Sequence, residues 1–258
     1  MRRLKEILVL LLLLLLALPA ETFAQSAGGQ ISRKPKTAVK KDTPKKTTPS
    51  KSTAKKPAAK RETCPPVPTA VDLGLPSGTL WADRNIGANS PEGYGDYFAW
   101  GETRPKSVYD WSTYKYCNGS SDTMTKYCTN SSYGIVDNKT VLEAADDAAT
   151  ANWGKFWRMP THAEQEELNS KCTWTWTTRN GVKGYKVIGP NGNRIFLPAA
   201  GFCSDNSVYS PDSYGHYWSA SLNESYPYLA WGMYFLSVNH YSDYYSRCRG
   251  HGVRAVAK

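Results

Sequence analysis

The amino-acid composition changes abruptly near residue 62, and this change confines folding to the part of the chain that follows. Residues 31–62 consist almost entirely of Lys, Pro, Thr, Ala and Ser. A segment with so few apolar side chains cannot bury enough surface to offset its chain entropy. We therefore expect residues 25–62 to be a disordered tether and residues 63–258 to form one folded domain.

The basic character of the chain belongs to the tether. The formal net charge is +10, and residues 31–62 hold 12 of the 32 Lys and Arg but only 2 of the 22 Asp and Glu. Residues 63–258 carry 17 basic and 18 acidic residues, so the folded domain lacks the basic excess that nucleic-acid binding requires. The tether is expected either to meet an anionic polymer of the cell envelope or to act as a solvated spacer.

The first 24 residues have the pattern of a signal peptide. Arg2, Arg3 and Lys5 precede an apolar run over residues 7–18, which is too short to span a membrane. We expect an exported protein that is periplasmic, on the cell surface or secreted, with no transmembrane segment in the mature chain.

Six cysteines in an exported chain suggest disulfide bonds. Cys117 and Cys128 bracket the segment NGSSDTMTKY, so we expect them to form a bridge. The pairing of the other four stays open: Cys64, Cys172, Cys203 and Cys248. Because there is no CxxC pair and no cluster of histidines, the sequence predicts neither a metal site nor a cofactor.

Short strands between glycine and proline turns dominate the expected secondary structure. A helix is predicted over residues 142–153, with Asp146 and Asp147 exposed, and another from Thr161 to about Lys171, where Glu164 completes a capping box. Residues 102–133 read as a long ordered loop. Strands are expected at 70–74, 79–86, within 93–101, and at 172–178, 184–188, 194–197, 214–219, 229–236 and 252–256. This pattern predicts an α+β fold, mostly antiparallel.

Residues 214–256 combine many tyrosines and tryptophans with Ser, Asn and Gly, a mixture typical of recognition surfaces. We assign to the core Trp218, Trp231, Tyr234, Phe235, Val253 and Val256. Residues 239–249 are expected to form a loop. The predicted binding residues are Tyr226, Tyr228, Asn239, His240, Tyr241, Asp243, Tyr244, Tyr245 and Arg249. The alternative is a solvent-exposed, tyrosine-rich loop that binds no partner.

Six motifs follow one another in the order AVDLGLPSGTLWADRNIGA, GDYFAWGET, WRMPTHAEQEEL, IFLPAAG, YWSAS and GHGVRAV. In this order, residues 70–256 resemble the Fibrobacter succinogenes major paralogous domain, a relative of the formylglycine-generating-enzyme/sulfatase-modifying domains. The resemblance implies a C-type-lectin-like fold and a bacterial surface or secreted protein. Similar domains serve as variable proteins of diversity-generating retroelements. Gln165 and His251 depart from the aromatic residues common at these positions of the family.

Enzymatic functions find little support in the residues. A formylglycine-generating-type oxidase needs a pair of thiols near the C-terminus, where this chain has Cys248 alone. The four histidines are scattered and no nucleophile motif is present, so no catalytic residues are predicted. We expect a non-enzymatic recognition module for an unknown protein or glycan. The alternatives are a structural envelope protein held by its basic tether and, less favoured, the oxidase.

Overall fold

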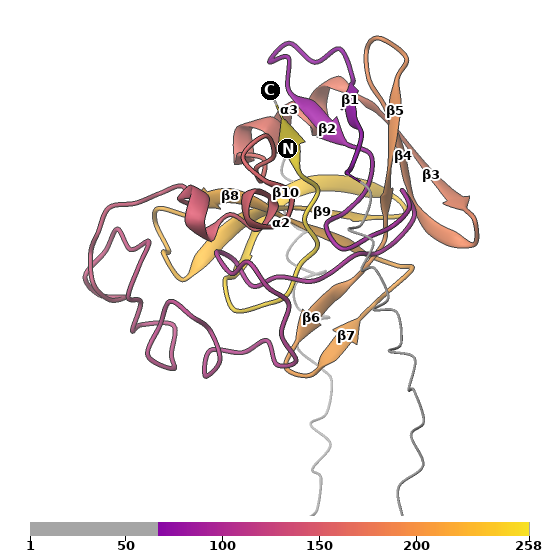
Figure 1. Ribbon diagram of the computed structural model, residues 1–258. Coiled ribbons are helices and arrows are strands. Elements are labelled where there is room, and N and C mark those ends of the chain that lie inside the picture. The colour runs from indigo at the N-terminus through magenta and orange to yellow at the C-terminus, as the bar shows by residue number, and fades with distance from the viewer. Residues whose placement is uncertain (1–66, 258) are drawn as a thin grey trace, which may run out of the picture. The chain divides into compact units, whose positions relative to one another are not determined.

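Short antiparallel strands make up most of the regular structure in residues 67–257, the part of the chain that the computed structural model describes (Figure 1). The expected signal peptide, the tether and Cys64 lie outside the described residues. The predicted α+β class is confirmed, since the sheets are mostly antiparallel and are accompanied by two α-helices. None of the helices within 67–257 is long and apolar enough to cross a membrane.

Three three-stranded sheets and one hairpin form the framework. The first sheet has the order β1-β2-β11, and the second the order β3-β4-β5. The third has the order β10-β9-β8, and β6 pairs with β7 in a separate hairpin. The strands are β1 (Ala70–Asp72), β2 (Leu80–Ala82), β3 (Thr173–Arg179), β4 (Val182–Ile188), β5 (Arg194–Pro198), β6 (Phe202–Ser204), β7 (Ser207–Tyr209), β8 (Gly215–Leu222), β9 (Leu229–Leu236), β10 (Asn239–Ser246) and β11 (Val256–Ala257).

Helix α3 (His162–Lys171) begins where the capping box predicts. The Thr161 side chain accepts a hydrogen bond from the backbone N–H of Glu164, and the Glu164 carboxylate accepts one from the backbone N–H of Thr161. That carboxylate also pairs with Arg158 at 2.6 Å and accepts from the Thr79 hydroxyl at 2.8 Å. Although burial opposes it, these contacts lower the pKa of Glu164 to about 2. The helix start is therefore joined to Thr79, the residue before β2.

The helix expected over 142–153 is broken into two pieces, a 3₁₀ turn (Ala144–Asp146) and α2 (Ala148–Trp153). Asp146 and Asp147 are both buried, so their predicted exposure is wrong. Asp146 contacts the Lys126 ammonium at 2.5 Å and accepts from the Tyr127 hydroxyl at 2.8 Å. Asp147 accepts from the backbone N–H groups of Thr150 and Met159, at 2.9 and 2.8 Å. Partners from a distant segment make burial of Asp146 tolerable, and nearby backbone N–H groups do so for Asp147.

The predicted long loop over residues 102–133 is confirmed, but its expected disulfide is not formed. Cys117 and Cys128 are free thiols, as are the other three described cysteines. The Cys117 Sγ donates to the Trp111 carbonyl at 3.1 Å, and the Cys128 Sγ to the Asn130 carbonyl at 3.1 Å. Each thiol therefore has a local partner, and polar contacts to other segments hold the loop instead.

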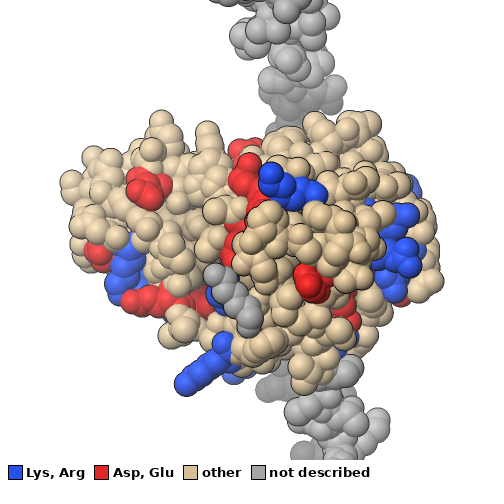
Figure 2. All heavy atoms as spheres, turned by 90° about the horizontal axis from the view of Figure 1, so that it is seen from above, with Lys and Arg blue, Asp and Glu red and all other residues tan. Residues whose placement is uncertain are grey.

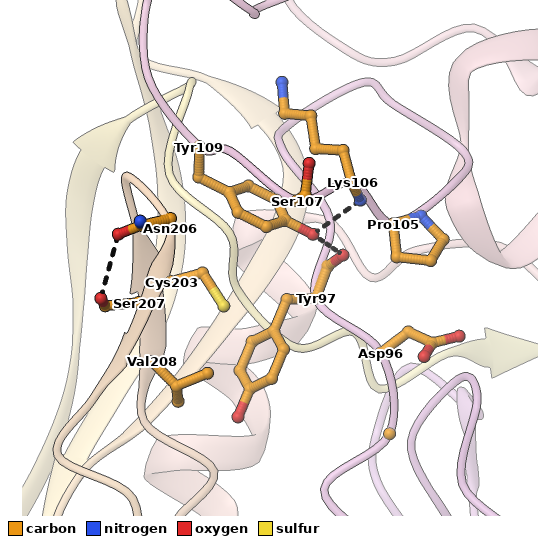
Figure 3. Close-up of a pocket in the computed structure, with 11 residues that line it drawn as sticks. Asp96, Tyr97, Pro105, Lys106, Ser107, Tyr109, Cys203, Asn206, Ser207 and Val208 are labelled. Carbon is orange, nitrogen blue, oxygen red and sulfur yellow. Dashed lines mark hydrogen bonds between the residues drawn. The ribbon is translucent and has the colours of Figure 1, made fainter. Parts of the chain in front are cut away.

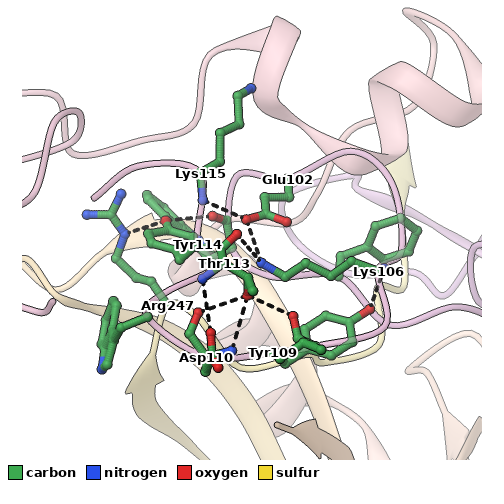
Figure 4. A network of polar contacts seen from close by, with 12 residues as sticks. Glu102, Lys106, Tyr109, Asp110, Thr113, Tyr114, Lys115 and Arg247 are labelled. Carbon is green, nitrogen blue, oxygen red and sulfur yellow. Dashed lines mark hydrogen bonds and ion pairs between the residues drawn. The ribbon is translucent and has the colours of Figure 1, made fainter. Parts of the chain in front are cut away.

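Arg247 is the main anchor of this loop (Figure 4). Its side chain is fully buried, and its Nε donates to the Tyr114 hydroxyl at 2.8 Å. The remaining guanidinium nitrogens donate to the backbone carbonyls of Lys126, Tyr127 and Pro227 at 3.0, 3.0 and 2.7 Å. The guanidinium also lies 4.8 Å from the Trp100 ring centroid. A planar group with five donors suits such a cage of carbonyl and hydroxyl oxygens.

The central hairpins follow the sequence prediction, whereas the aromatic run at 93–101 does not. Trp174 and Trp176 both pack against Tyr185, as expected for one face of β3. Within 93–101 only Phe98 pairs, through an isolated bridge to His251. Gly95 has φ 73°, and a Cβ there would lie 2.2 Å from the Ile86 carbonyl oxygen, so this glycine is required where the run turns against its neighbour.

Candidate functional site

Strand β10 lies at the edge of its sheet, where the sequence predicts a loop. All eight of its residues pair with β9, and no other strand in the described part of the chain pairs with it. Leu236 lies opposite Asn239, so Ser237 and Val238 alone make the turn between the strands. The loop prediction for 239–249 is wrong because aromatic and polar residues occupy both faces of β10, which hides the two-residue period of a strand.

The register of β10 separates its tyrosines onto two sides of the sheet. Tyr241 lies opposite Tyr234, which lies opposite His216, so these three side chains share one side. Tyr244 lies opposite Trp231 and points to the other side, toward α3. Consecutive tyrosines in the sequence therefore belong to different surfaces.

We name the side away from α3 the tyrosine face and define it by Tyr214, Tyr234, Tyr241 and Tyr245. The ring centroids of Tyr234 and Tyr241 are 5.1 Å apart, and those of Tyr214 and Tyr234 are 5.7 Å apart. Tyr241 is 43% exposed and Tyr214 36% exposed, while Tyr234 and Tyr245 are half-buried. Asp243 is on the same side of β10. Burial and this carboxylate raise the pKa of Tyr245, so its phenol stays protonated.

The β6–β7 hairpin continues the tyrosine face beyond β8. The His216 ring lies 4.9 Å from the Phe202 ring, and Phe202 stacks on Tyr209 at 5.5 Å. The Arg249 guanidinium lies 5.3 Å from the Phe202 centroid. An almost unbroken row of rings thus runs from β10 to β7, with one cation at its margin.

Two buried histidines form the floor of the tyrosine face. His216 and His251 have ring centroids 4.9 Å apart, and each lies about as far from Tyr245. His251 also stacks on Trp218 at 4.0 Å. Burial lowers the pKa of His216 to about 4 and that of His251 well below its ordinary value. Both rings are therefore neutral near pH 7, and the floor is uncharged.

The α3 side of the sheet holds other members of the predicted set. Tyr244 packs edge-on against Trp231 at 5.4 Å, and Trp231 stacks on His162 of α3 at 4.0 Å. His240 stacks on Trp174 at 4.3 Å. These contacts attach β10 to its neighbours. Trp231 and Tyr234 were expected in the core, but both are only half-buried, whereas Trp218, Phe235, Val253 and Val256 are buried as predicted.

Tyr226 and Tyr228 occupy a third location, in the turn before β9. Tyr228 packs against Tyr133 at 5.2 Å and against Tyr226 at 6.1 Å. The structure therefore brings together four of the nine predicted binding residues, on or beside the tyrosine face. These four are Tyr241, Asp243, Tyr245 and Arg249. Asn239 is exposed at the start of β10.

A cavity of about 270 Å³ lies on the other side of the β6–β7 hairpin (Figure 3). Cys203 and Val208 line it, because they alternate with Phe202 and Tyr209 along their strands. The Tyr109 hydroxyl at its wall donates to the Tyr97 carbonyl at 2.6 Å. The Lys106 ammonium points away from the cavity and pairs with Glu102 at 2.9 Å.

The thiols near this cavity are not poised for nucleophilic chemistry. Burial raises the pKa of Cys203 to about 11 and that of Cys248 to about 12, so both are protonated near pH 7. Arg249 lowers the pKa of Cys248, but burial has the larger effect. Within residues 67–257, no group of three or more His, Cys, Asp or Glu side chains is placed to hold a metal ion.

On the face that Figure 2 shows, charged side chains form small groups between broad uncharged areas, and acidic and basic atoms adjoin in several of them. This distribution agrees with the near balance of acidic and basic residues beyond residue 62. Contacts on the folded domain therefore depend on aromatic and neutral polar groups more than on a long-range field.

Sequence reasoning missed several residues that complete the tyrosine face. Tyr214 and His216 lie within the segment considered, but their side of β8 follows only from the pairing with β9. Phe202 and Tyr209 come from the hairpin β6–β7, which no sequence pattern predicted. No family model, curated protein or solved structure matches the chain.

Proposed function

We propose that this protein is an exported, non-enzymatic recognition module that binds a protein or glycan through the tyrosine face. The observation that carries the proposal is the row Tyr214, Tyr234 and Tyr241, which presents partly exposed rings above an uncharged, buried floor. We also propose that residues 63–258 have a C-type-lectin-like fold, behind a signal peptide and a basic tether, and that export places the domain outside the cytoplasm.

The packing of the rings favours binding. A tyrosine held against neighbouring rings loses little side-chain freedom when a ligand arrives, and its ring and hydroxyl offer both apolar contact and hydrogen bonding. Asp243 and Arg249 add an acceptor and a donor at the margin. Such a combination of central aromatic rings and peripheral polar groups is typical of binding hot spots.

Glycan and protein arrays would test this function. The full chain is compared with the double variant Tyr234→Ala/Tyr241→Ala, and we expect the variant to lose at least about 90% of the bound signal, since hot-spot truncations cost roughly 2 kcal/mol or more. Tyr226→Ala/Tyr228→Ala is the matched control, because it removes two partly exposed tyrosines elsewhere. Equal binding by both double variants, or no binding by the unmodified chain, would contradict the tyrosine face as the site.

A structural role in the cell envelope is the second candidate, favoured by the 12 basic residues of segment 31–62 beside a nearly neutral domain. Envelope attachment would then weaken as salt screens the charges. Deleting residues 31–62 should release the protein from envelope fractions, while Tyr234→Ala/Tyr241→Ala should leave it attached. Envelope attachment that changes neither with salt concentration nor on deletion of residues 31–62 would contradict this candidate.

A further inference from the structure

We propose that two copies of this chain associate by antiparallel pairing of their β10 strands about a two-fold axis at Ser242. The proposal goes beyond ligand recognition and does not depend on which ligand is bound. It joins two three-stranded sheets into one sheet of six strands. The occupant of the β10 edge is thus a second copy of the same chain.

The β10 edge has few of the features that normally prevent such pairing. Edge strands are commonly protected by charged side chains, proline, a bulge or extreme shortness. β10 has eight residues in uninterrupted register with β9, without lysine or proline, and none of its side chains is fully buried. Its only acidic residue is Asp243, whose carboxylate accepts a hydrogen bond from the Tyr244 backbone N–H at 2.8 Å. Val238 in the adjoining turn is 80% exposed, which leaves an apolar group beside the edge.

Symmetry limits the possible registers. A two-fold axis perpendicular to the sheet keeps each side chain on its own side, so the axis must lie midway between one residue and its own copy, not at a level between two successive residues. Only axes at Ser242 and at Asp243 allow seven residue pairs within β10. Axes at other positions leave at least two fewer pairs.

The side chains decide between these two registers. An axis at Asp243 places two carboxylates directly opposite each other, about 5 Å apart at their Cβ atoms, which is unfavourable. An axis at Ser242 places Ser242 opposite its own copy. Tyr241 then lies opposite Asp243 of the other copy, so a phenol meets a carboxylate on the tyrosine face. On the α3 side, His240 lies opposite Tyr244 of the other copy.

This self-complementarity is the reason to prefer a second copy over an unrelated extended peptide. The two contacts, Tyr241 with Asp243 and His240 with Tyr244, each form twice by symmetry. The pairing also makes the two tyrosine faces continuous, so that a repeating ligand would meet two sites at once. Because seven residue pairs bury a small area, we expect weak, concentration-dependent association.

Ser242→Cys tests the register directly. In the Ser242-centred pairing the two new thiols lie opposite each other, within reach of a disulfide. Under mild oxidation we expect a covalent dimer on non-reducing gels, at least about tenfold more abundant than for the unmodified chain. Asp243→Cys is the matched control, since in this register its thiol faces Tyr241 and should not cross-link. Circular dichroism verifies that both variants are folded.

Sedimentation velocity over a concentration series measures the association itself, with the full chain and with the chain lacking residues 1–24. We expect the same concentration-dependent dimer in both, because the β10 edge and not the apolar run of residues 7–18 would cause the association. A monomer at all concentrations, or cross-linking of Asp243→Cys in place of Ser242→Cys, overturns the proposal. If the protein is a monomer but still binds an array ligand, only the β10 pairing is refuted. If it forms the dimer but binds no array ligand, only the recognition function is refuted.

Discussion

Strand β10 and the stretch that follows it, residues 247–254, both carry polar side chains but lie in opposite environments. β10 is polar and aromatic, and lies open to solvent with two tyrosines 43% exposed. The next stretch carries three arginines and a histidine, yet Arg247, His251 and Arg254 are essentially inaccessible. Polar or charged character alone therefore does not determine which part is interior. The difference lies in the hydrogen-bond acceptors that other segments offer to the side chains.

Arg247 and Arg254 are buried because other segments offer acceptors for them. Arg254 donates to the Asn85 side chain at 2.9 Å and to the carbonyls of Ala82 and Phe196 at 3.1 and 2.9 Å. Arg247 makes the equivalent contacts with the 102–133 loop and Pro227. The stretch 247–254 thus ties the fold together, whereas β10 leaves its side chains available to other molecules.

The largest expected effect is that of Arg247→Ala. Its removal leaves at least three buried carbonyls and the Tyr114 hydroxyl without their partner, so the free energy of unfolding should fall by about 3–5 kcal/mol. Urea denaturation measures the loss. Arg249→Ala, on the margin of the tyrosine face, is the control and should change stability by less than about 0.5 kcal/mol. Equal losses for the two variants would show that the buried Arg247 contributes no more to stability than Arg249.

As the pH falls, the fold should lose stability through its interior histidines before it loses the contribution of Glu164. The pKa of His216 is about 4 in the folded protein and that of His251 lies well below its ordinary value, so the unfolded chain takes up protons first as pH falls below 6.5. Their full contribution is present above pH 6.5 and declines toward pH 4, by roughly 1.4 kcal/mol per pH unit for each histidine.

Denaturation midpoints between pH 7 and pH 4.5 measure this slope. Glu164 does not interfere, because its lowered pKa makes its contribution decline only below pH 4.5. The double variant His216→Phe/His251→Phe should flatten the profile in this window. An unchanged slope in the double variant would show that other groups cause it.

His251→Phe alone should stabilise the protein. Both ring nitrogens of His251 are buried without a hydrogen-bond partner among the described residues, and the ring stacks on Trp218. Phenylalanine keeps the ring and removes the desolvated nitrogens, so we expect a gain of about 1 kcal/mol at pH 7. His216→Phe is the comparison and should gain less, since only its Nδ1 is buried without a partner. A loss of stability in His251→Phe would reveal a partner for its nitrogens.

The smallest effect on stability is expected for Tyr241→Ala on β10, less than about 0.5 kcal/mol in thermal or urea denaturation. Its side chain is 43% exposed, so truncation removes little buried area. Tyr217→Ala should by contrast cost about 3–5 kcal/mol, because that ring is fully buried and its hydroxyl donates to the Pro198 carbonyl at 2.7 Å. Similar losses in both variants would place β10 in the core.

Local signals in the sequence predicted local structure well. The capping box at Thr161 and Glu164 fixes the start of α3, because both of its hydrogen bonds join residues three positions apart. The turn at Asn180 and Gly181 likewise joins two predicted strands. These contacts need no information from distant segments.

Predictions that depended on distant contacts failed. Asp146 was expected to be exposed because adjacent carboxylates in a helix favour solvent, but Lys126 and Tyr127, some twenty residues earlier, pair with it. The site shows the same limit. Tyr241 and Tyr245 could be predicted from composition, whereas Phe202 and Tyr209 join them only through tertiary packing.

The position of β2 between β1 and β11 has a consequence for protein engineering. Val71 and Val256 both pair with Trp81, from opposite sides, so the first and last strands of residues 67–257 are two strand spacings apart, about 10 Å. A short flexible linker can bridge that gap. The domain is therefore suited to insertion into a surface loop of a host protein and to circular permutation, with new ends opened at the exposed Val238 turn.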